Sequence, residues 1–371
     1  MSVLDPHTWD LRRYPPTKDR SLRAFDAADQ LALTEVAPSL GSGRVLVVND
    51  SFGGLAVPLS AAGADVTVWT DSVLSEIAVR QNLQANDLPE AAIVPSTMQP
   101  NGRFGIVIVK VPKTLAFLEE QLVGLRMCVG NDTRIVGAGM VKHIHTSTLD
   151  IFSKAIGPTV TSLATRKARL ILPMFDAALD PAEPALTRYA TDQGVTCLSR
   201  ANVFSHSKLD IGTRLLLDHL PGVDDGAAVV DLGCGNGVLG TSLGRTFDGG
   251  SLTFCDISHA AVASAEATWL DNHAGDARGR FIAGDLAAEV ASGSVDLVMI
   301  NPPFHDQHVV GDETAGRMFV EARRILRDGG EVRVIGNRHM GYHKRLKSIF
   351  GNLDTVASNP KFVVLSSRKA R

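Results

Sequence analysis

The sequence contains 371 residues, of which 44% are hydrophobic, and this is more than one core usually holds, so two domains are expected. A formal charge of −3 excludes a protein that is basic throughout, so any surface for nucleic acid has to be a local patch. Four cysteines with no C-x-x-C spacing argue against disulfides and a metal site. Because no signal peptide or membrane-length apolar run is found, a cytoplasmic protein without a membrane partner is predicted.

The first half of the chain contains three β-rich runs. They cover residues 44–54, 65–71 and 105–113. A segment with two prolines, several alanines and acidic residues, 175–199, then separates the two halves. The sequence therefore predicts one domain over residues 1–180 and a second over residues 195–371.

In the second half, short β-rich runs alternate with helical stretches. Strands are expected over residues 227–231, 251–256, 279–283, 295–301 and 331–337, and helices over residues 238–247, 260–273 and 313–326. This alternation is typical of an α/β fold with a doubly wound, mostly parallel sheet. Such sheets bind ligands outside the carboxyl ends of their strands, where the most informative motifs of this chain lie.

The first half repeats the plan of the second half in weaker form. We interpret the chain as two tandem Rossmann-like domains with a degenerate N-terminal copy; two unrelated α/β domains are the alternative. In our alignment of the sequences, Ser51 and Leu55 replace Gly233 and Gly237, and Lys110 replaces the asparagine of the second copy. Side chains in the turn obstruct a ligand, and a lysine accepts no hydrogen bond, so the N-terminal copy is not expected to catalyse.

A glycine-rich turn, residues 231–237, follows the first strand of the second half. Glycines permit a positive φ and let main-chain N–H groups approach a ligand, so Gly233, Gly235 and Gly237 are candidate cofactor-binding residues. Asp231, which opens the turn, is expected to accept a hydrogen bond from the cationic amino-acid part of a cofactor or to order the turn. Its alternative is a simple strand-end cap. Dinucleotide enzymes use related turns, so the turn alone does not identify the cofactor.

Two further aspartates end the next strands of the second half. Asp256 can accept both hydroxyls of a ribose, the role of an acidic residue in related nucleotide-binding folds. Asp285 can accept the amino group of an adenine, with turn capping as the alternative. Both are candidate cofactor-binding residues.

The motif Asn301-Pro302-Pro303-Phe304 follows an apolar strand and has the residues needed for chemistry on an amine. The exocyclic amino group of a base is a poor nucleophile, because its lone pair is delocalised into the ring. The Asn301 side-chain oxygen and the Pro302 carbonyl can accept its two hydrogens, and the prolines stiffen the backbone that aims them. Phe304 can stack on a flipped-out base, which is worth roughly 1–3 kcal/mol. Together with the upstream turn, the motif indicates methyl transfer from S-adenosyl-L-methionine; a plain Asn-Pro turn is the alternative.

These motifs resemble those of class I methyltransferases that act on the N2 amine of guanine in ribosomal RNA. The resemblance extends to residues 204–213 before the glycine-rich turn and to residues 337–344 after the catalytic motif. It implies S-adenosyl-L-methionine as cofactor, with Asp210 among the residues that bind it. It also implies a catalytic C-terminal domain and an N-terminal copy that supports RNA recognition or folding.

Residues 11–15, 24–29 and 49–53 resemble the branch of this family that acts on large-subunit RNA. We therefore predict methylation of a guanine N2 in 23S ribosomal RNA, with no obligate protein partner evident. The alternatives are a 16S ribosomal RNA substrate, methylation of adenine N6, of a protein glutamine or of a small molecule, and a non-catalytic RNA-binding assembly factor. The basic residues expected to contact phosphates are Arg12, Arg13, Arg166, Lys167, Arg338, Lys344 and Arg345.

Overall fold

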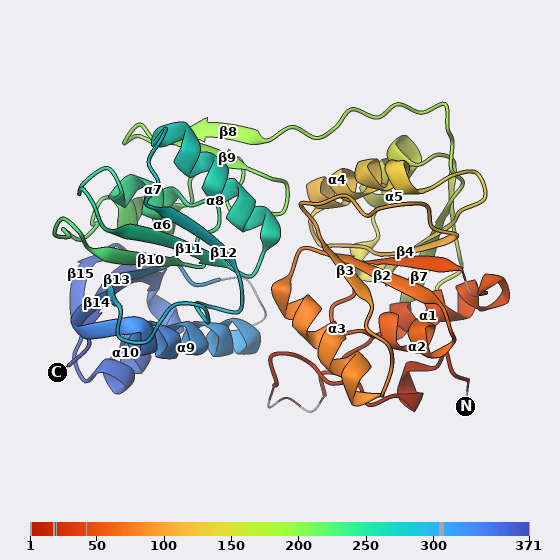
Figure 1. Cartoon of the computed structure of the whole chain (residues 1–371), viewed down its shortest axis with the longest axis horizontal. Helices are drawn as coiled ribbons and strands as arrows, with labels where there is room; N and C mark the ends of the chain where they lie inside the picture. The colour runs from red at the N-terminus through yellow and green to blue at the C-terminus, as the bar shows by residue number, and fades with distance from the viewer. Residues whose placement is uncertain (1, 18, 20, 42, 304–307, 371) are drawn as a thin grey trace. The chain divides into compact units, whose positions relative to one another are not determined.

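The computed structural model describes residues 2–17, 19, 21–41, 43–303 and 308–370. The chain forms two compact units, Met1–Ala185 and Leu186–Arg371. Each unit is built on one seven-stranded sheet with helices on both faces (Figure 1). None of the helices in the described ranges is long and apolar enough to cross a membrane.

The first unit has the strand order β3-β2-β1-β4-β5-β7-β6. Its strands are β1 (Arg44–Val48), β2 (Asp65–Thr70), β3 (Ala92–Pro95), β4 (Ile106–Lys110), β5 (Arg134–Met140), β6 (Thr159–Thr161) and β7 (Ala168–Pro173). Its α-helices are α1 (Ala27–Val36), α2 (Ala56–Ala61), α3 (Val73–Ala85), α4 (Leu115–Leu125) and α5 (Thr146–Ala155). Only β7 runs antiparallel to its two neighbours in this sheet.

The second unit opens with a hairpin of β8 (Thr187–Ala190) and β9 (Thr196–Ser199). Its main sheet has the order β12-β11-β10-β13-β14-β16-β15. The strands are β10 (Ala228–Leu232), β11 (Ser251–Asp256), β12 (Gly279–Ala283), β13 (Val295–Ile300), β14 (Leu326–Asn337), β15 (Asp354–Ser358) and β16 (Phe362–Arg368). The helices are α6 (Ile211–Leu217), α7 (Val238–Leu243), α8 (His259–Asn272), α9 (His308–Ile325) and α10 (Tyr342–Phe350).

The two main sheets share one strand order, with the same single antiparallel strand next to the edge. The predicted fold, a doubly wound α/β architecture present twice, is therefore confirmed. In the second unit, the sequence analysis did not predict α6, α10 or the C-terminal pair β15 and β16, and it placed the β8–β9 hairpin in the segment between the domains. In the first unit, it predicted only the runs that contain β1, β2 and β4.

Alternation along β10 shows how the second sheet is covered on both faces. Val229 packs in a core with Leu216 of α6 and Trp269 of α8. Val230, which points the opposite way, packs in a core with Phe319 of α9 and Leu346 of α10. Because both faces are buried, the central strands consist mostly of apolar residues, as in other parallel sheets.

The strand ends align the two copies more accurately than the sequence did. Asn49, the residue after β1, donates its N–H to the carbonyl of Trp69 at 2.9 Å. Gly233, the residue after β10, donates its N–H to the carbonyl of Cys255 at 2.8 Å, at the equivalent place on the neighbouring strand. Asn49 therefore corresponds to Gly233, and the sequence alignment, which set Asn49 against Asp231, was wrong by two residues.

Candidate active site

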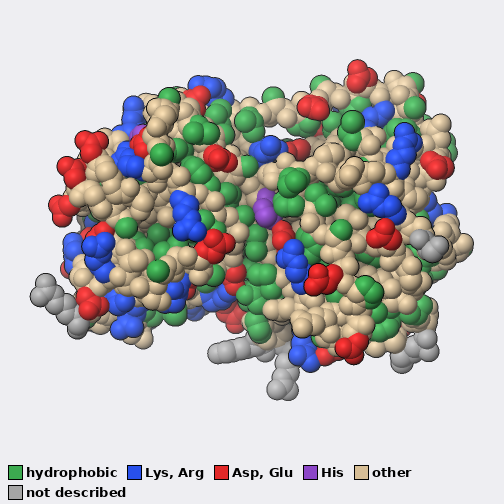
Figure 2. Space-filling view, viewed as in Figure 1, with side chains coloured by type: hydrophobic (Ala, Val, Ile, Leu, Met, Phe, Trp, Pro, Cys, Tyr) green, Lys and Arg blue, Asp and Glu red, His purple; other side chains and the backbone are tan. Residues whose placement is uncertain are grey.

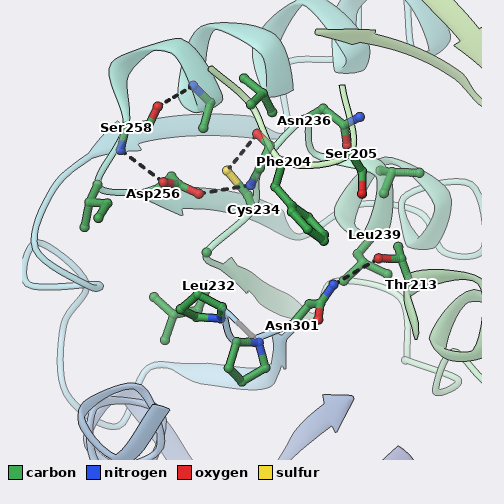
Figure 3. A pocket seen from close by; sticks show the side chains of 18 of the residues that line it. Phe204, Ser205, Thr213, Leu232, Cys234, Asn236, Leu239, Asp256, Ser258 and Asn301 are labelled. Atoms are coloured by element: carbon green, nitrogen blue, oxygen red, sulfur yellow. Dashed lines mark hydrogen bonds between the residues drawn. The ribbon is translucent and has the colours of Figure 1, made fainter. Parts of the chain in front are cut away.

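A cavity of about 370 Å³ lies in the second unit, at the carboxyl ends of β10, β11 and β13. Segments far apart in the sequence line it, including the glycine-rich turn, the start of the catalytic motif and the segment before α6. In the view of Figure 3, Asp256 and Asn301 lie on different sides of the cavity and the ring of Phe204 projects between them. Its lining includes Tyr189, Phe204, Thr213, Gly233, Cys234, Gly235, Asn236, Asp256, Ser258, Leu286, Asn301, Pro302 and Met318.

The three glycines of the turn all have positive φ, but for different reasons. Gly233 has φ +76° and turns the chain away from β10. Gly235 has φ +54°, and an added Cβ would meet no atom within 4 Å, so its backbone borders open space in the cavity. Gly237 has φ +74°, and a Cβ there would lie 2.8 Å from the Cβ of Ala265. Gly237 therefore permits close packing of the turn on α8, whereas Gly235 leaves room for a ligand.

Asp256 ends β11 and holds the turn through its carboxylate. Its Oδ2 accepts the N–H of Gly235 at 3.0 Å, and its Oδ1 accepts the N–H of Ser258 at 3.0 Å. The residue lines the cavity and is half-buried. A carboxylate in this place can accept further hydrogen bonds from ligand hydroxyls.

Asp231 lies behind the turn and is 1% exposed. Its Oδ2 accepts the N–H of Gly240 in α7 at 2.9 Å, which ties β10 to the helix. Burial raises the pKa of this carboxyl to about 7, and the charge of Asp256 adds to the shift. Within the described residues no donor reaches Asp231 Oδ1, and Asp231 is not among the residues that line the cavity.

Asn301 follows the end of β13 and lines the cavity with Pro302. Its Nδ2 donates a hydrogen bond to Thr213 Oγ1 at 2.9 Å (Figure 3). Its Oδ1 is buried, and the described part of the chain supplies no donor to it. The side-chain oxygen is thus an unused acceptor in the place where the sequence predicted one. Phe304, the predicted stacking residue, lies outside the described residues.

Like Asp231 and Gly237, the remaining two predicted cofactor residues are not among the residues that line the cavity. Asp210 is the N-cap of α6, where its carboxylate accepts the N–H groups of Gly212 and Thr213 at 2.8 and 3.1 Å. Asp285 accepts two hydrogen bonds from Arg317, at 2.6 and 2.8 Å, and precedes Leu286, which lines the cavity.

Sequence reasoning assigned no site role to the hairpin wall of the cavity. Asn236 in the turn donates from Nδ2 to the hydroxyls of Tyr189 in β8 and Ser199 in β9, at 3.0 and 3.1 Å. The hairpin is thereby fastened to the glycine-rich turn, and Tyr189 lines the cavity. The asparagine between two glycines could have indicated a site role for Asn236. Its partners could not be predicted, because they lie about forty residues earlier in the chain.

Phe204 was named only as part of a resemblance, yet its ring is 49% exposed and lines the cavity. An exposed aromatic ring at a cavity mouth can stack on a planar ligand. The described residues contain no group of three or more His, Cys, Asp or Glu side chains that could hold a metal ion.

The equivalent place in the first unit is occupied by the protein's own charges. Lys110, at the end of β4, donates from Nζ to Asp26 Oδ1 at 2.8 Å and to Asp29 Oδ1 at 2.5 Å. Burial raises the pKa of Asp29 to about 6 despite the nearby ammonium group. This ion cluster stands where the second unit has the neutral pair of Asn301 and Thr213.

The turn of the first unit is likewise satisfied internally. Asp50 accepts the N–H groups of Gly53, Leu55 and Ala56 at 2.8, 3.0 and 2.8 Å. By the strand alignment, Asp50 corresponds to Cys234, which lines the cavity of the second unit. The carboxylate that orders this turn therefore belongs to a residue in the turn itself, whereas in the second unit the carboxylates of Asp231 and Asp256, at the ends of two strands, hold the turn.

The strand order, the glycine-rich turn and the cavity at the strand ends define the second unit as a class I methyltransferase fold, and the first unit repeats that fold. Ribosomal RNA large subunit methyltransferase G of Streptomyces griseus is 46% identical to this chain, over 97% of each. The protein of that name from Stutzerimonas stutzeri is 44% identical over the full length of both. The chain therefore belongs to the family of ribosomal RNA large subunit methyltransferase G.

Two family models and one solved structure agree with this assignment. Residues 1–178 match the RLMG N-terminal domain, and residues 194–366 match the methyltransferase small domain. A Thermus thermophilus structure, described as a 16S rRNA N2 G1207 methyltransferase in complex with AdoMet and guanosine, matches all of this chain with a TM-score of 0.76. At 22% identity, that likeness concerns the fold.

Proposed function

We propose that this protein transfers a methyl group from S-adenosyl-L-methionine to the N2 amine of a guanine in 23S ribosomal RNA. The observation that carries the proposal is the buried oxygen of Asn301, a cavity-lining residue, because the described residues supply no donor to this oxygen. The large-subunit substrate is proposed from the names of relatives that are 44–46% identical over nearly the whole chain. Guanine N2 is proposed from the Asn-Pro-Pro-Phe motif and its family resemblance.

S-adenosyl-L-methionine, when bound, supplies an electrophilic methyl group. Gly233 and Gly235 present backbone to the cavity, and Asp256 has oxygens for the ribose hydroxyls. Asp231 orders the turn by accepting the N–H of Gly240, and among the described residues no donor reaches its second oxygen, which is the proposed acceptor for a cationic group. Asp285 would share its carboxylate between Arg317 and the adenine amino group, since a carboxylate has about four lone-pair sites.

For the acceptor, Asn301 Oδ1 and the Pro302 carbonyl take the two amine hydrogens and let the nitrogen lone pair localise toward the methyl donor. Pro302 is buried, so its backbone is held while the base enters. Phe304 and Phe204 are the proposed stacking partners of the flipped base. Asp210 and Gly237 support this site through the start of α6 and the packing of the turn.

RNA contact is proposed to depend on local patches rather than on overall charge. On the face drawn in Figure 2, Lys and Arg side chains are interspersed with Asp and Glu over both units. Arg166, Lys167, Arg338 and Lys344 are exposed, whereas Arg12 is ion-paired with Asp10 at 2.5 Å. We propose that the first unit assists RNA recognition or folding, because its own site is closed by charge.

The test is transfer of labelled methyl to unmodified 23S and 16S RNA by the wild type and by Asn301→Ala. Loss of the acceptor should lower turnover about 10²- to 10³-fold, the usual cost of one preorganised polar group, while cofactor binding persists. N2-methylguanine in digested 23S RNA is expected. Label in 16S RNA alone would overturn the choice of subunit, and a fully active Asn301→Ala variant would overturn the mechanism.

A further inference from the structure

Asn301 lines the cavity, and the nitrogen of its amide points to Thr213 of α6 (Figure 3). Nδ2 donates to Thr213 Oγ1 at 2.9 Å, while the buried Oδ1 has no donor among the described residues. The two ends of an amide have nearly the same shape but opposite hydrogen-bonding character. Its orientation therefore decides whether the cavity meets an acceptor or a donor, and only an acceptor suits an amine.

We propose that Thr213 is a positioning residue that holds the Asn301 side chain at the cavity wall, where it can meet the acceptor amine. The inference rests on the proposed function, because it assigns how that site presents its acceptor. The Thr213 hydroxyl oxygen accepts the Nδ2 hydrogen, which leaves Oδ1 as the free end of the amide. Without the hydroxyl, the NH₂ group would be left unpaired in a buried place, at a cost that a rotated amide avoids.

The fold holds Thr213 where it can do this. The residue is 5% exposed in the first turn of α6, and its N–H donates to the N-cap carboxylate of Asp210 at 3.1 Å. The side chain of Asp210 thus fixes the backbone that carries the hydroxyl. The predicted cofactor residue Asp210 acquires a second role, as the outer support of the amide.

The first unit contains the same contact in a different chemical form. Asp26 caps α1 by accepting the N–H groups of Ala28 and Asp29, just as Asp210 caps α6, so Asp29 corresponds to Thr213. There, Lys110 donates to Asp29 at 2.5 Å. In both units the residue at the strand end donates to the third residue after the N-cap. The geometry is retained, but the donor differs: the amide of Asn301 also carries an acceptor oxygen, whereas the ammonium group of Lys110 carries none.

The experiment compares Thr213→Val, which keeps the shape and removes the hydroxyl, with Thr213→Ser, which keeps the hydroxyl. Thr241→Val is the matched control, because Thr241 is fully buried outside the cavity lining and its hydroxyl has no partner among the described residues. Measurements are kcat and KM for 23S RNA, the Kd of S-adenosyl-L-methionine and the Tm. Thr213→Val is also combined with Asn301→Ala.

We expect Thr213→Val to lower kcat about 10- to 100-fold, as loss of a supporting contact does elsewhere, with KM, Kd and Tm nearly unchanged. Thr213→Ser should keep most of the wild-type kcat. In the Asn301→Ala background, Thr213→Val should lower kcat no further. A normal kcat in Thr213→Val would overturn the inference, and so would weaker cofactor binding by this variant. The inference would also be wrong if Thr213→Val lowered kcat by the same factor in the Asn301→Ala background as in the wild type. An inactive wild type, or an Asn301→Ala variant with full activity, would instead reject the proposed function.

Discussion

At the scale of residues, substitution of Gly235 in the glycine-rich turn should change both the stability of the protein and its affinity for the cofactor. Gly235 borders the cavity, so an alanine methyl group would enter the cavity and would also strain a left-handed residue. The strain costs roughly 1–2 kcal/mol of stability. Gly235→Ala should therefore lose both stability and cofactor affinity, the latter by about tenfold for each 1.4 kcal/mol.

The matched control is Gly293→Ala, because Gly293 has φ +66° and open space around its Cβ position, but lies outside the cavity lining. It should lose similar stability and bind S-adenosyl-L-methionine normally in calorimetric titration. Equal affinities in the two variants would argue that the turn does not contact the cofactor.

Lys110 is the residue that closes the site of the first unit, and its removal should be costly. Lys110→Met leaves the carboxylates of Asp26 and Asp29 together in a mostly buried place. Breaking a buried ion pair on one side typically costs about 3–5 kcal/mol. We expect faster hydrogen exchange in β4 and α1 of the full-length chain. Lys142→Met, at an exposed position, is the control, and unchanged exchange in Lys110→Met would show that the cluster contributes no stability.

At the scale of elements, Asp231 links β10 to α7, and the free energy of unfolding should depend on pH through its carboxyl group. Its pKa is raised by burial to about 7, above the value of about 3.9 expected in an unfolded chain. The folded state thus binds the proton more tightly. The resulting stability is fully present below about pH 4 and is lost as the pH rises to about 7, by at most about 4 kcal/mol.

Asp231→Asn keeps the acceptor for Gly240 and cannot ionise, so it should remove this part of the pH dependence. The measurement is denaturant unfolding of both proteins from pH 4 to pH 8, with the difference between them plotted against pH. Parallel curves over this range would mean that Asp231 does not titrate there. Asp29 titrates near pH 6 in both proteins and cancels in the difference.

At the scale of the whole molecule, each unit has its own sheet and its own buried cores. A chain of residues 186–371 should therefore fold alone and bind S-adenosyl-L-methionine with the affinity of the full protein. If the first unit assists RNA recognition, transfer to 23S RNA should fall through a higher KM. Full transfer activity by residues 186–371 would remove the proposed role of the first unit in RNA recognition.

Most of the fold was predictable because its signals are local. Apolar runs such as 295–300 appear in the structure as strands within one residue of the prediction, and the strands at 251–256 and 279–283 have the predicted ends. The alternation of these strands with helices then predicted a mostly parallel, doubly wound sheet. The order of the edge strands was not predictable, since β15 and β16 pair through contacts that no local pattern encodes.

The sequence alone determined the family, the glycine-rich turn and the Asn-Pro-Pro motif, because φ preferences and hydrogen-bonding types belong to single residues and short spacings. It could not align the two copies correctly at the turn, because glycines recur there at every second position and several alignments fit equally well. The pairing of the strands in each sheet fixes one alignment. Only the tertiary structure joined Thr213 with Asn301, and Asn236 with its hairpin partners. Their contacts cross tens of residues in the chain, and the physical reason for each appears only when the strand ends are brought together at one edge of the sheet.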